Sequence, residues 1–120
     1  MLSIDISNQQ TTVKVDTRRM RDAARTVLDD AGTKTAQISI AIVDDQTIRP
    51  LNRKYLEHDD ATDVLSFVME RDADRLEGEV VASAETAARV AERLDWTADD
   101  ELLLYVVHGM LHLVGHDDAT

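Results

Sequence analysis

The sequence contains no cysteine, which excludes disulfide bonds and thiolate metal sites and fits a reducing environment such as the cytoplasm. It has no long apolar run and its first residues carry no basic segment, so neither a membrane span nor a signal peptide is predicted. Aromatic residues make up only 3% of the chain, which argues against an aromatic platform on which bases stack. We therefore expect a cytoplasmic protein without a membrane partner.

Positive charge is also scarce, because 24 acidic residues outnumber 13 basic ones and the formal net charge is −11. Such a balance disfavours a broad electrostatic grip on nucleic acid, and no DNA partner is expected. A local basic patch remains compatible with it. The densest one is Arg18, Arg19, Arg21 and Arg25, on the outer face of a predicted helix, where charged clusters are typical of a solvated surface.

A length of 120 residues predicts one domain, residues 1–120, large enough to bury a core. Alternating or β-branched apolar residues predict strands, and capping residues followed by apolar stripes predict helices. The charged stretch 71–77 is predicted to have no regular structure, and the helix after Ser83 is predicted to bury its alanines and Leu94. The resulting order β-α-β-α-β-β-α-α indicates an α+β fold, a mixed sheet of about four strands packed with helices. The predicted strands are 2–6, 38–43, 62–69 and 78–83, and the predicted helices begin after Asp16 or Thr17, Thr47 (with Pro50 in the first turn), Ser83 and Thr97.

Three of the four histidines lie within nine positions near the end of the sequence. The run before them, Leu102–Val107, is apolar on every side, which predicts a buried final helix. A spacing of four places His108 and His112 one above the other on one helical face. This is the geometry by which two imidazoles share one metal ion.

A third ligand is expected just beyond this pair. Gly115 favours an end to the helix, because glycine readily adopts the left-handed turn that follows a last helical turn. A returning chain could then bring Asp118 to the metal, whereas His116 would serve if the helix continued through the glycine. The glycine favours Asp118. Three protein ligands with an open fourth position are typical of a catalytic zinc site, so one Zn²⁺ per chain is expected.

Several segments together resemble the YbeY endoribonucleases, a family of rRNA maturation factors. The family signature His-Gly-x-Leu-His-Leu-x-Gly-Tyr-Asp-His is similar to residues 108–118, and a block containing Thr-Asp-Val-Leu-Ser-Phe is matched by residues 62–67. Leu51-Asn52 and Tyr55-Leu56 resemble a preceding Leu-Asn and Tyr-Arg, and Gly78-Glu79-Val80 resembles Gly-Asp-Ile. The resemblance covers about residues 38–118, and two long blocks in the right order are far more specific than a single motif.

This resemblance implies a zincin-like fold, with the metal near the end of the histidine helix and position 118 as its third ligand. It implies a zinc-dependent, single-strand-specific endoribonuclease that matures the 3′ end of 16S rRNA and serves ribosome quality control, with the small ribosomal subunit or its assembly factors as partners. The expected nucleophile is a water on the metal, and no protein base is assigned. Thr62, Asp63 and Ser66 are expected on the substrate side, although Thr62-Asp63 also suits an ordinary loop-to-strand junction.

The sequence departs from the family at four points. Asp118 replaces the third histidine, His116 replaces the tyrosine, and Leu56 replaces an arginine implied to hold substrate phosphate, a role that Arg53 or Lys54 could take. The family continues past the motif, so we expect a truncated or naturally short member. Two other functions stay open, a zincin-type peptidase and a non-catalytic, ribosome-associated metal-binding module. Against the peptidase, Gly109 stands where such enzymes have their glutamate base.

Overall fold

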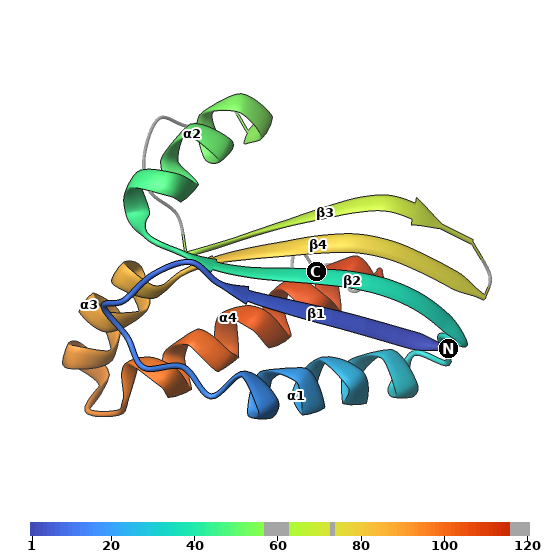
Figure 1. Ribbon diagram of the computed structural model, residues 1–120, viewed down its shortest axis with the longest axis horizontal. Coiled ribbons are helices and arrows are strands. Elements are labelled where there is room, and N and C mark those ends of the chain that lie inside the picture. The colour runs from blue at the N-terminus through green and yellow to red at the C-terminus, as the bar shows by residue number, and fades with distance from the viewer. Residues whose placement is uncertain (57–62, 73, 116–120) are drawn as a thin grey trace.

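The computed structural model describes residues 1–56, 63–72 and 74–115. Within these residues, four strands and four helices follow one another in the predicted order, and together they form one mixed sheet with helices packed against it (Figure 1). The predicted α+β fold is therefore confirmed. The elements are β1 (Leu2–Asn8), α1 (Thr17–Asp30), β2 (Thr35–Val43), α2 (Asp45–Leu56), β3 (Val64–Arg71), β4 (Arg75–Ser83), α3 (Ala84–Leu94) and α4 (Ala98–Leu113).

The strands lie in the order β1-β2-β4-β3. β1 and β4 both run parallel to β2, whereas β3 pairs antiparallel with β4 and forms one edge of the sheet. Alternate residues of a strand point to opposite faces, so Ile38, Ile40 and Ile42 all point to one side and all are buried there. That side carries the main core.

Helices α1 and α4 cover this face of the sheet, and α2 lies on the opposite side (Figure 1). α4 contacts α1, α3, β3 and β4, so it is the most central of the helices. Its side chains Leu102, Val106, Met110 and Leu113 are fully buried. Each such side chain contributes about 1.5–3 kcal/mol through its removal from water. No helix among the described residues is long and apolar enough to cross a membrane.

The prediction that residues 71–77 lack regular structure is wrong. β3 continues to Arg71 and β4 begins at Arg75, so only a tight turn separates the two strands. The Asp72 carboxylate accepts hydrogen bonds from the backbone N–H groups of Asp74 (3.1 Å) and Arg75 (3.0 Å). An aspartate that bonds to the backbone ahead of it is a turn-forming device, and the high charge of this stretch masks the hairpin.

Helix α2 begins earlier than predicted. The Asp44 carboxylate accepts a hydrogen bond from the Thr47 backbone N–H at 2.8 Å, so Asp44 takes the capping role expected of Thr47. Pro50 consequently lies inside the helix rather than in its first turn. The other predicted caps are correct: Asp16 caps α1, Ser83 caps α3, and Thr97 forms a capping box with Asp100 at the start of α4.

Helix α4 is not buried all round, although the apolar run predicts it. Leu104 is 50% exposed, and Val107 and Leu111 are only partly buried. The predicted inward position of Leu94 is likewise wrong, since that side chain is 57% exposed at the end of α3. In each helix the residues on the face toward the sheet or toward neighbouring helices fill the core, and the apolar residues on the opposite flank stay in contact with water.

Candidate functional site

His108 and His112 lie on the exposed flank of α4, opposite the residues that anchor the helix in the core. Their ring centroids are 6.0 Å apart and the ring planes are tilted by 31°. The spacing of four therefore brings the two imidazoles together as predicted, with both rings accessible to a ligand from outside. The core supplies the rigid support, because the same helix is fixed by four fully buried side chains.

Glycine at position 109 allows α4 to lie very close to the sheet. A Cβ atom there would be 2.8 Å from Cγ1 of Val80 and 3.3 Å from Cγ2 of Val64. Gly78 on β4 does the same further along, where a Cβ would lie 2.9 Å from Cδ2 of Leu113. A side chain at Gly109 would push the helix away from the sheet, and one at Gly78 would force the Leu113 side chain or the β3 backbone to shift. Close packing therefore sets the height of the two histidines relative to the edge strand.

A cavity of about 380 Å³ lies between β3 and the histidine face of α4. Ser66 pairs with Val80, whose side chain contacts α4, so the Ser66 side chain also points to the helix side of the sheet. Of the predicted substrate residues, Asp63 and Ser66 share this cavity with both histidines, and Thr62 lies outside the described residues. The cavity is lined by Asp63, Val64, Leu65, Ser66, Phe67, His108 and His112.

The helix ends where the glycine predicts it. α4 ends at Leu113, and Gly115 has a φ of +100°, in the left-handed region. The backbone N–H of Gly115 donates to the His112 carbonyl at 3.1 Å, which closes the last turn. The two candidate third ligands, Asp118 and His116, lie outside the described residues. Within residues 1–56, 63–72 and 74–115, no three histidine or acidic side chains are grouped closely enough to hold a metal ion.

A family model described as Endoribonuclease YbeY matches residues 5–120 of the chain. The chain belongs to the YbeY family. The resemblance carried by residues 51–67 and 108–118 is thus confirmed at the level of the family. A YbeY endoribonuclease from Syntrophotalea carbinolica is 39% identical over 119 residues, which are 95% of this chain and 79% of that protein.

Two further comparisons place the chain among its relatives. The YbeY endoribonuclease of Rhodopirellula baltica is 48% identical over 91 residues, 74% of this chain, and the match spans about half of that protein (47%). The solution structure of TM1509 from Thermotoga maritima is 25% identical with a TM-score of 0.61, and the match covers 98% of this chain and 74% of that one. The YbeY relatives are thus longer than this chain.

The packing at Gly109 separates this YbeY chain from zincin peptidases. Those enzymes place a glutamate base between their two histidine ligands. Here the corresponding residue is buried against Val80 and Val64, so a glutamate would meet the sheet instead of the cavity. The close packing of α4 on the sheet therefore requires glycine, and not glutamate, at position 109.

The polar stripe of α4 extends beyond the histidines. Glu101, Tyr105, His108 and His112 follow one another at helical spacings of four, three and four. Glu101 accepts a hydrogen bond from Nε1 of Trp96 at 3.1 Å. Burial raises the pKa of Tyr105 well above its usual value, and its hydrogen bond with Glu101 raises it further. Tyr105 therefore keeps its hydroxyl proton, at a position three residues before His108 that the sequence spacing alone could have suggested.

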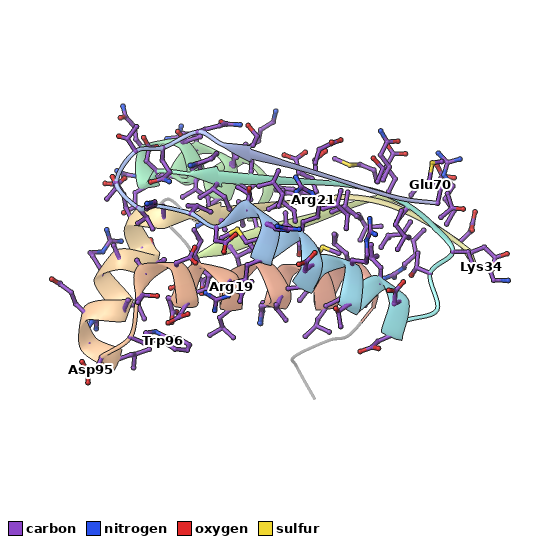
Figure 2. The ribbon with its side chains drawn as sticks, turned by 60° about the horizontal axis from the view of Figure 1, so that its bottom comes forward. Arg19, Arg21, Lys34, Glu70, Asp95 and Trp96 are labelled. Carbon is purple, nitrogen blue, oxygen red and sulfur yellow. The ribbon has the colours of Figure 1, made fainter. Side chains whose placement is uncertain are left out.

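Two of the four arginines of α1 bond to other parts of the fold. Arg19 pairs with Asp99 (3.2 Å) and Asp100 (2.8 Å) in the first turn of α4, and Figure 2 shows it between the two helices. Nε of Arg21 donates to the Ile4 carbonyl of β1 at 3.4 Å. The densest basic patch of the sequence therefore serves in part to attach α1 to its neighbours.

Proposed function

We propose that this chain is a single-strand-specific, zinc-dependent endoribonuclease that acts in the maturation of ribosomal RNA. Its substrate is the 3′ end of 16S rRNA, it serves ribosome quality control, and its partners are the small ribosomal subunit or its assembly factors. Membership of the YbeY family supports hydrolysis of RNA. The observation that carries the site is the cavity shared by Asp63, Ser66 and the two histidines.

The residues present suit one zinc ion. Two exposed imidazoles, one helical turn apart with ring centroids at 6.0 Å, are borderline-soft nitrogen donors of the kind that zinc prefers. Within the proposal His108, His112 and Asp118 hold the ion, with His116 as the alternative third ligand. When bound, zinc acts as a Lewis acid toward a phosphoryl oxygen and lowers the pKa of its water to about 7.

The cavity favours a single strand. A volume of about 380 Å³ is at the lower end of small-molecule sites, about 300–1,000 Å³, and suits one splayed-out nucleotide better than a duplex. Ser66 can donate its hydroxyl hydrogen to a phosphate oxygen. Asp63 is an acceptor whose charge repels phosphate, so we assign it to a ribose hydroxyl or a base amino group.

Asp63 is well placed for such orientation because its backbone is fixed. Its carboxylate accepts from the Val64 backbone N–H at 2.7 Å, and its carbonyl accepts from the Ser83 N–H at 2.9 Å. The start of β3 is thereby tied to the end of β4. A nucleotide bound there meets a rigid wall formed by the edge strand.

One assay separates this function from its competitors. The purified chain is incubated with labelled single-stranded RNA, the matching duplex and casein, each with and without a chelator, followed by added zinc. We expect cleavage of the single strand alone, loss of cleavage with the chelator, and recovery with zinc. Cleavage of casein would indicate the peptidase instead. Stoichiometric zinc without cleavage of any substrate would indicate the non-catalytic module.

A further inference from the structure

We propose that Arg71 is a positioning residue for the metal site, because it fixes the last turn of α4, which carries His112. The inference rests on the proposed function, since it concerns the same zinc site. It is carried by three features of the described residues: an irregularity in β3, a contact between Arg71 and the last residue of α4, and the conformation of Gly115.

The first feature is a register shift that turns Arg71 toward the helix. Val68 pairs with Gly78, but Glu70 pairs with Glu77, so β3 contains one extra residue between the two pairs. Without it, Glu70 would oppose the buried Leu76 on the helix side, and Arg71 would oppose Arg75. With it, Arg71 opposes Leu76 and points to the face that α4 covers. A β-bulge redirects the side chains that follow it in this way. Here the basic Arg71, instead of the acidic Glu70, faces the end of α4.

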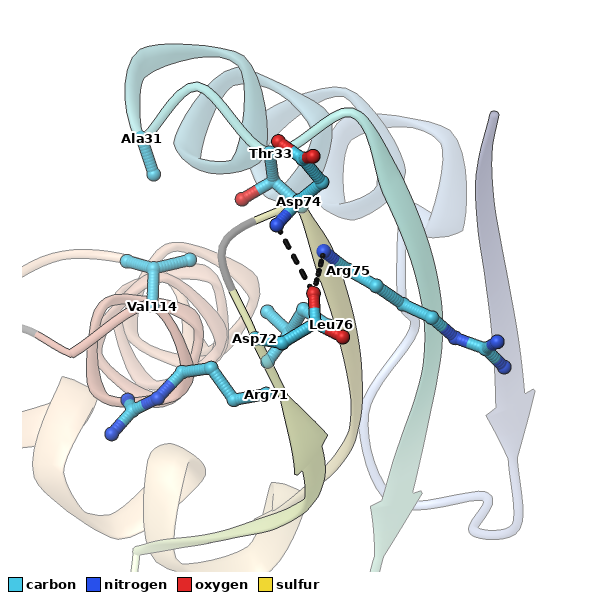
Figure 3. A pocket seen from close by; sticks show the side chains of 8 residues that line it. All are labelled: Ala31, Thr33, Arg71, Asp72, Asp74, Arg75, Leu76 and Val114. Atoms are coloured by element: carbon cyan, nitrogen blue, oxygen red, sulfur yellow. Dashed lines mark hydrogen bonds between the residues drawn. The ribbon is translucent and has the colours of Figure 1, made fainter.

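The second feature is the contact itself. Nη1 of Arg71 donates to the carbonyl of Leu113, the last residue of α4, at 3.3 Å. The last carbonyls of a helix have no intrahelical donor, and the negative end of the helix dipole attracts a cation. Figure 3 shows Arg71 reaching beneath the end of α4 near Val114, while Arg75 points the opposite way.

The third feature connects this contact to the site. Leu113 directly follows His112, and the His112 carbonyl accepts the Gly115 N–H at 3.1 Å. A Cβ on Gly115 would lie 3.3 Å from Nη1 of Arg71, so the guanidinium also borders the residue at which the chain turns away. The peptide units that follow His112 are therefore held from two sides. Loss of Arg71 would loosen the last turn of α4 and with it the position of the His112 imidazole.

The test compares Arg71→Gln with Arg75→Gln in the full 120-residue chain. Arg75 is a matched control because it lines the same surface cavity of about 120 Å³ as Arg71, and it forms a long ion pair with Glu77 at 4.0 Å. Zinc affinity is measured by competition with a chromogenic chelator, and unfolding of the metal-free chain is followed by circular dichroism. We expect Arg71→Gln to lower zinc affinity on the order of tenfold to a hundredfold. Arg75→Gln should leave it near that of the unaltered chain.

A spectroscopic readout distinguishes positioning from general stabilisation. With cobalt(II) in place of zinc, loss of a well-placed ligand weakens the visible absorption typical of four-coordinate cobalt, and only Arg71→Gln should show this. Arg71→Lys keeps a cation near the Leu113 carbonyl and should be intermediate, which also serves if the glutamine variant fails to fold. Equal zinc affinity in the Arg71→Gln and Arg75→Gln variants would overturn the role of Arg71 alone. No zinc binding by the unaltered chain would overturn the proposed metal site, and this inference with it.

Discussion

Aspartate at position 118 stands where the YbeY signature has histidine, and this single difference changes the charge of the proposed site. A carboxylate beside two neutral imidazoles leaves the metal centre with one positive charge less than three imidazoles would. α4 ends at Leu113 and Gly115 is left-handed, so the helix ends at the glycine, which is the condition under which the sequence favours Asp118 over His116.

Alanine variants at the two positions should therefore rank clearly. We expect Asp118→Ala to lower zinc affinity on the order of tenfold to a hundredfold or more, and His116→Ala to have a much smaller effect. Asp118→His should retain zinc, since it restores the signature of the family. The measurement is a zinc competition titration of all three variants beside the unaltered chain. The reverse ranking of the alanine variants would assign the third ligand to His116.

Single residues also show where prediction from the sequence succeeds. The pairing of His108 and His112 is predictable because residues four apart lie on the same face of a helix. The end of the helix at Gly115 is predictable because glycine is the residue that most readily adopts a positive φ. Arg71 could not be placed. Its direction depends on the extra residue between Val68 and Glu70, and a bulge is decided by pairing with β4 rather than by the local sequence.

At the scale of secondary-structure elements, Asp45 connects three segments that meet beside the site. Its carboxylate accepts hydrogen bonds from the hydroxyls of Ser83 (2.6 Å) and Thr86 (2.8 Å) and from Nη1 of Arg89 (2.7 Å). The first residue of α2 is thereby joined to the end of β4 and to α3. Burial alone would raise the pKa of Asp45, but the hydrogen bonds from Ser83, Arg89 and Thr86 outweigh it and lower the pKa below the ordinary value of 3.8.

This lowered pKa predicts a contribution to stability that depends on pH. A carboxyl group with a lower pKa in the folded chain stabilises the fold above its ordinary pKa, and the contribution is lost as the pH falls through the folded value. We therefore expect the free energy of unfolding, measured with urea, to fall as the pH is lowered from about 5 to about 2, and to fall less in Asp45→Asn. Asp5→Asn, on the exposed part of β1, is the control. An identical fall in Asp45→Asn and in the unaltered chain would show that the three hydrogen bonds do not favour the ionised form.

The order of the elements was predictable, but several of their boundaries were not. Capping residues such as Asp16, Ser83 and Thr97 have a direct local signature, and each caps the expected helix. Both strands of the β3–β4 hairpin are predicted, but not their extension through Arg71 and from Arg75, because exposed strand residues are as charged as loop residues and only the pairing reveals them. Helix α4 appeared wholly apolar in sequence, yet its flank with Leu104 and the histidines faces water because the sheet covers only one side.

For the whole molecule, a net charge of −11 must be reconciled with the proposed RNA substrate. Two of the four arginines of α1, Arg19 and Arg21, bond to other parts of the fold, which leaves Arg18 and Arg25 exposed on that helix. Two exposed basic residues in the last turn of α2, Arg53 and Lys54, are the candidates to replace the family arginine, whose position is occupied by Leu56. Affinity for RNA would then come mostly from the cavity and the metal, and only slightly from contacts with phosphates.

This view predicts a shallow dependence of RNA binding on salt. A protein that neutralises Z phosphates of a single strand shows a slope of about −0.7Z in log K against log salt concentration, so two contacts give about −1.4. We expect a slope no steeper than this for a short labelled single strand, measured by fluorescence anisotropy at several salt concentrations with zinc present. Arg53→Gln combined with Lys54→Gln should bring the slope close to zero. The same change at Arg18 and Arg25, two exposed arginines of α1, should leave it unaltered. A slope several times steeper, abolished by the α1 variant, would mean that RNA binds across α1 instead.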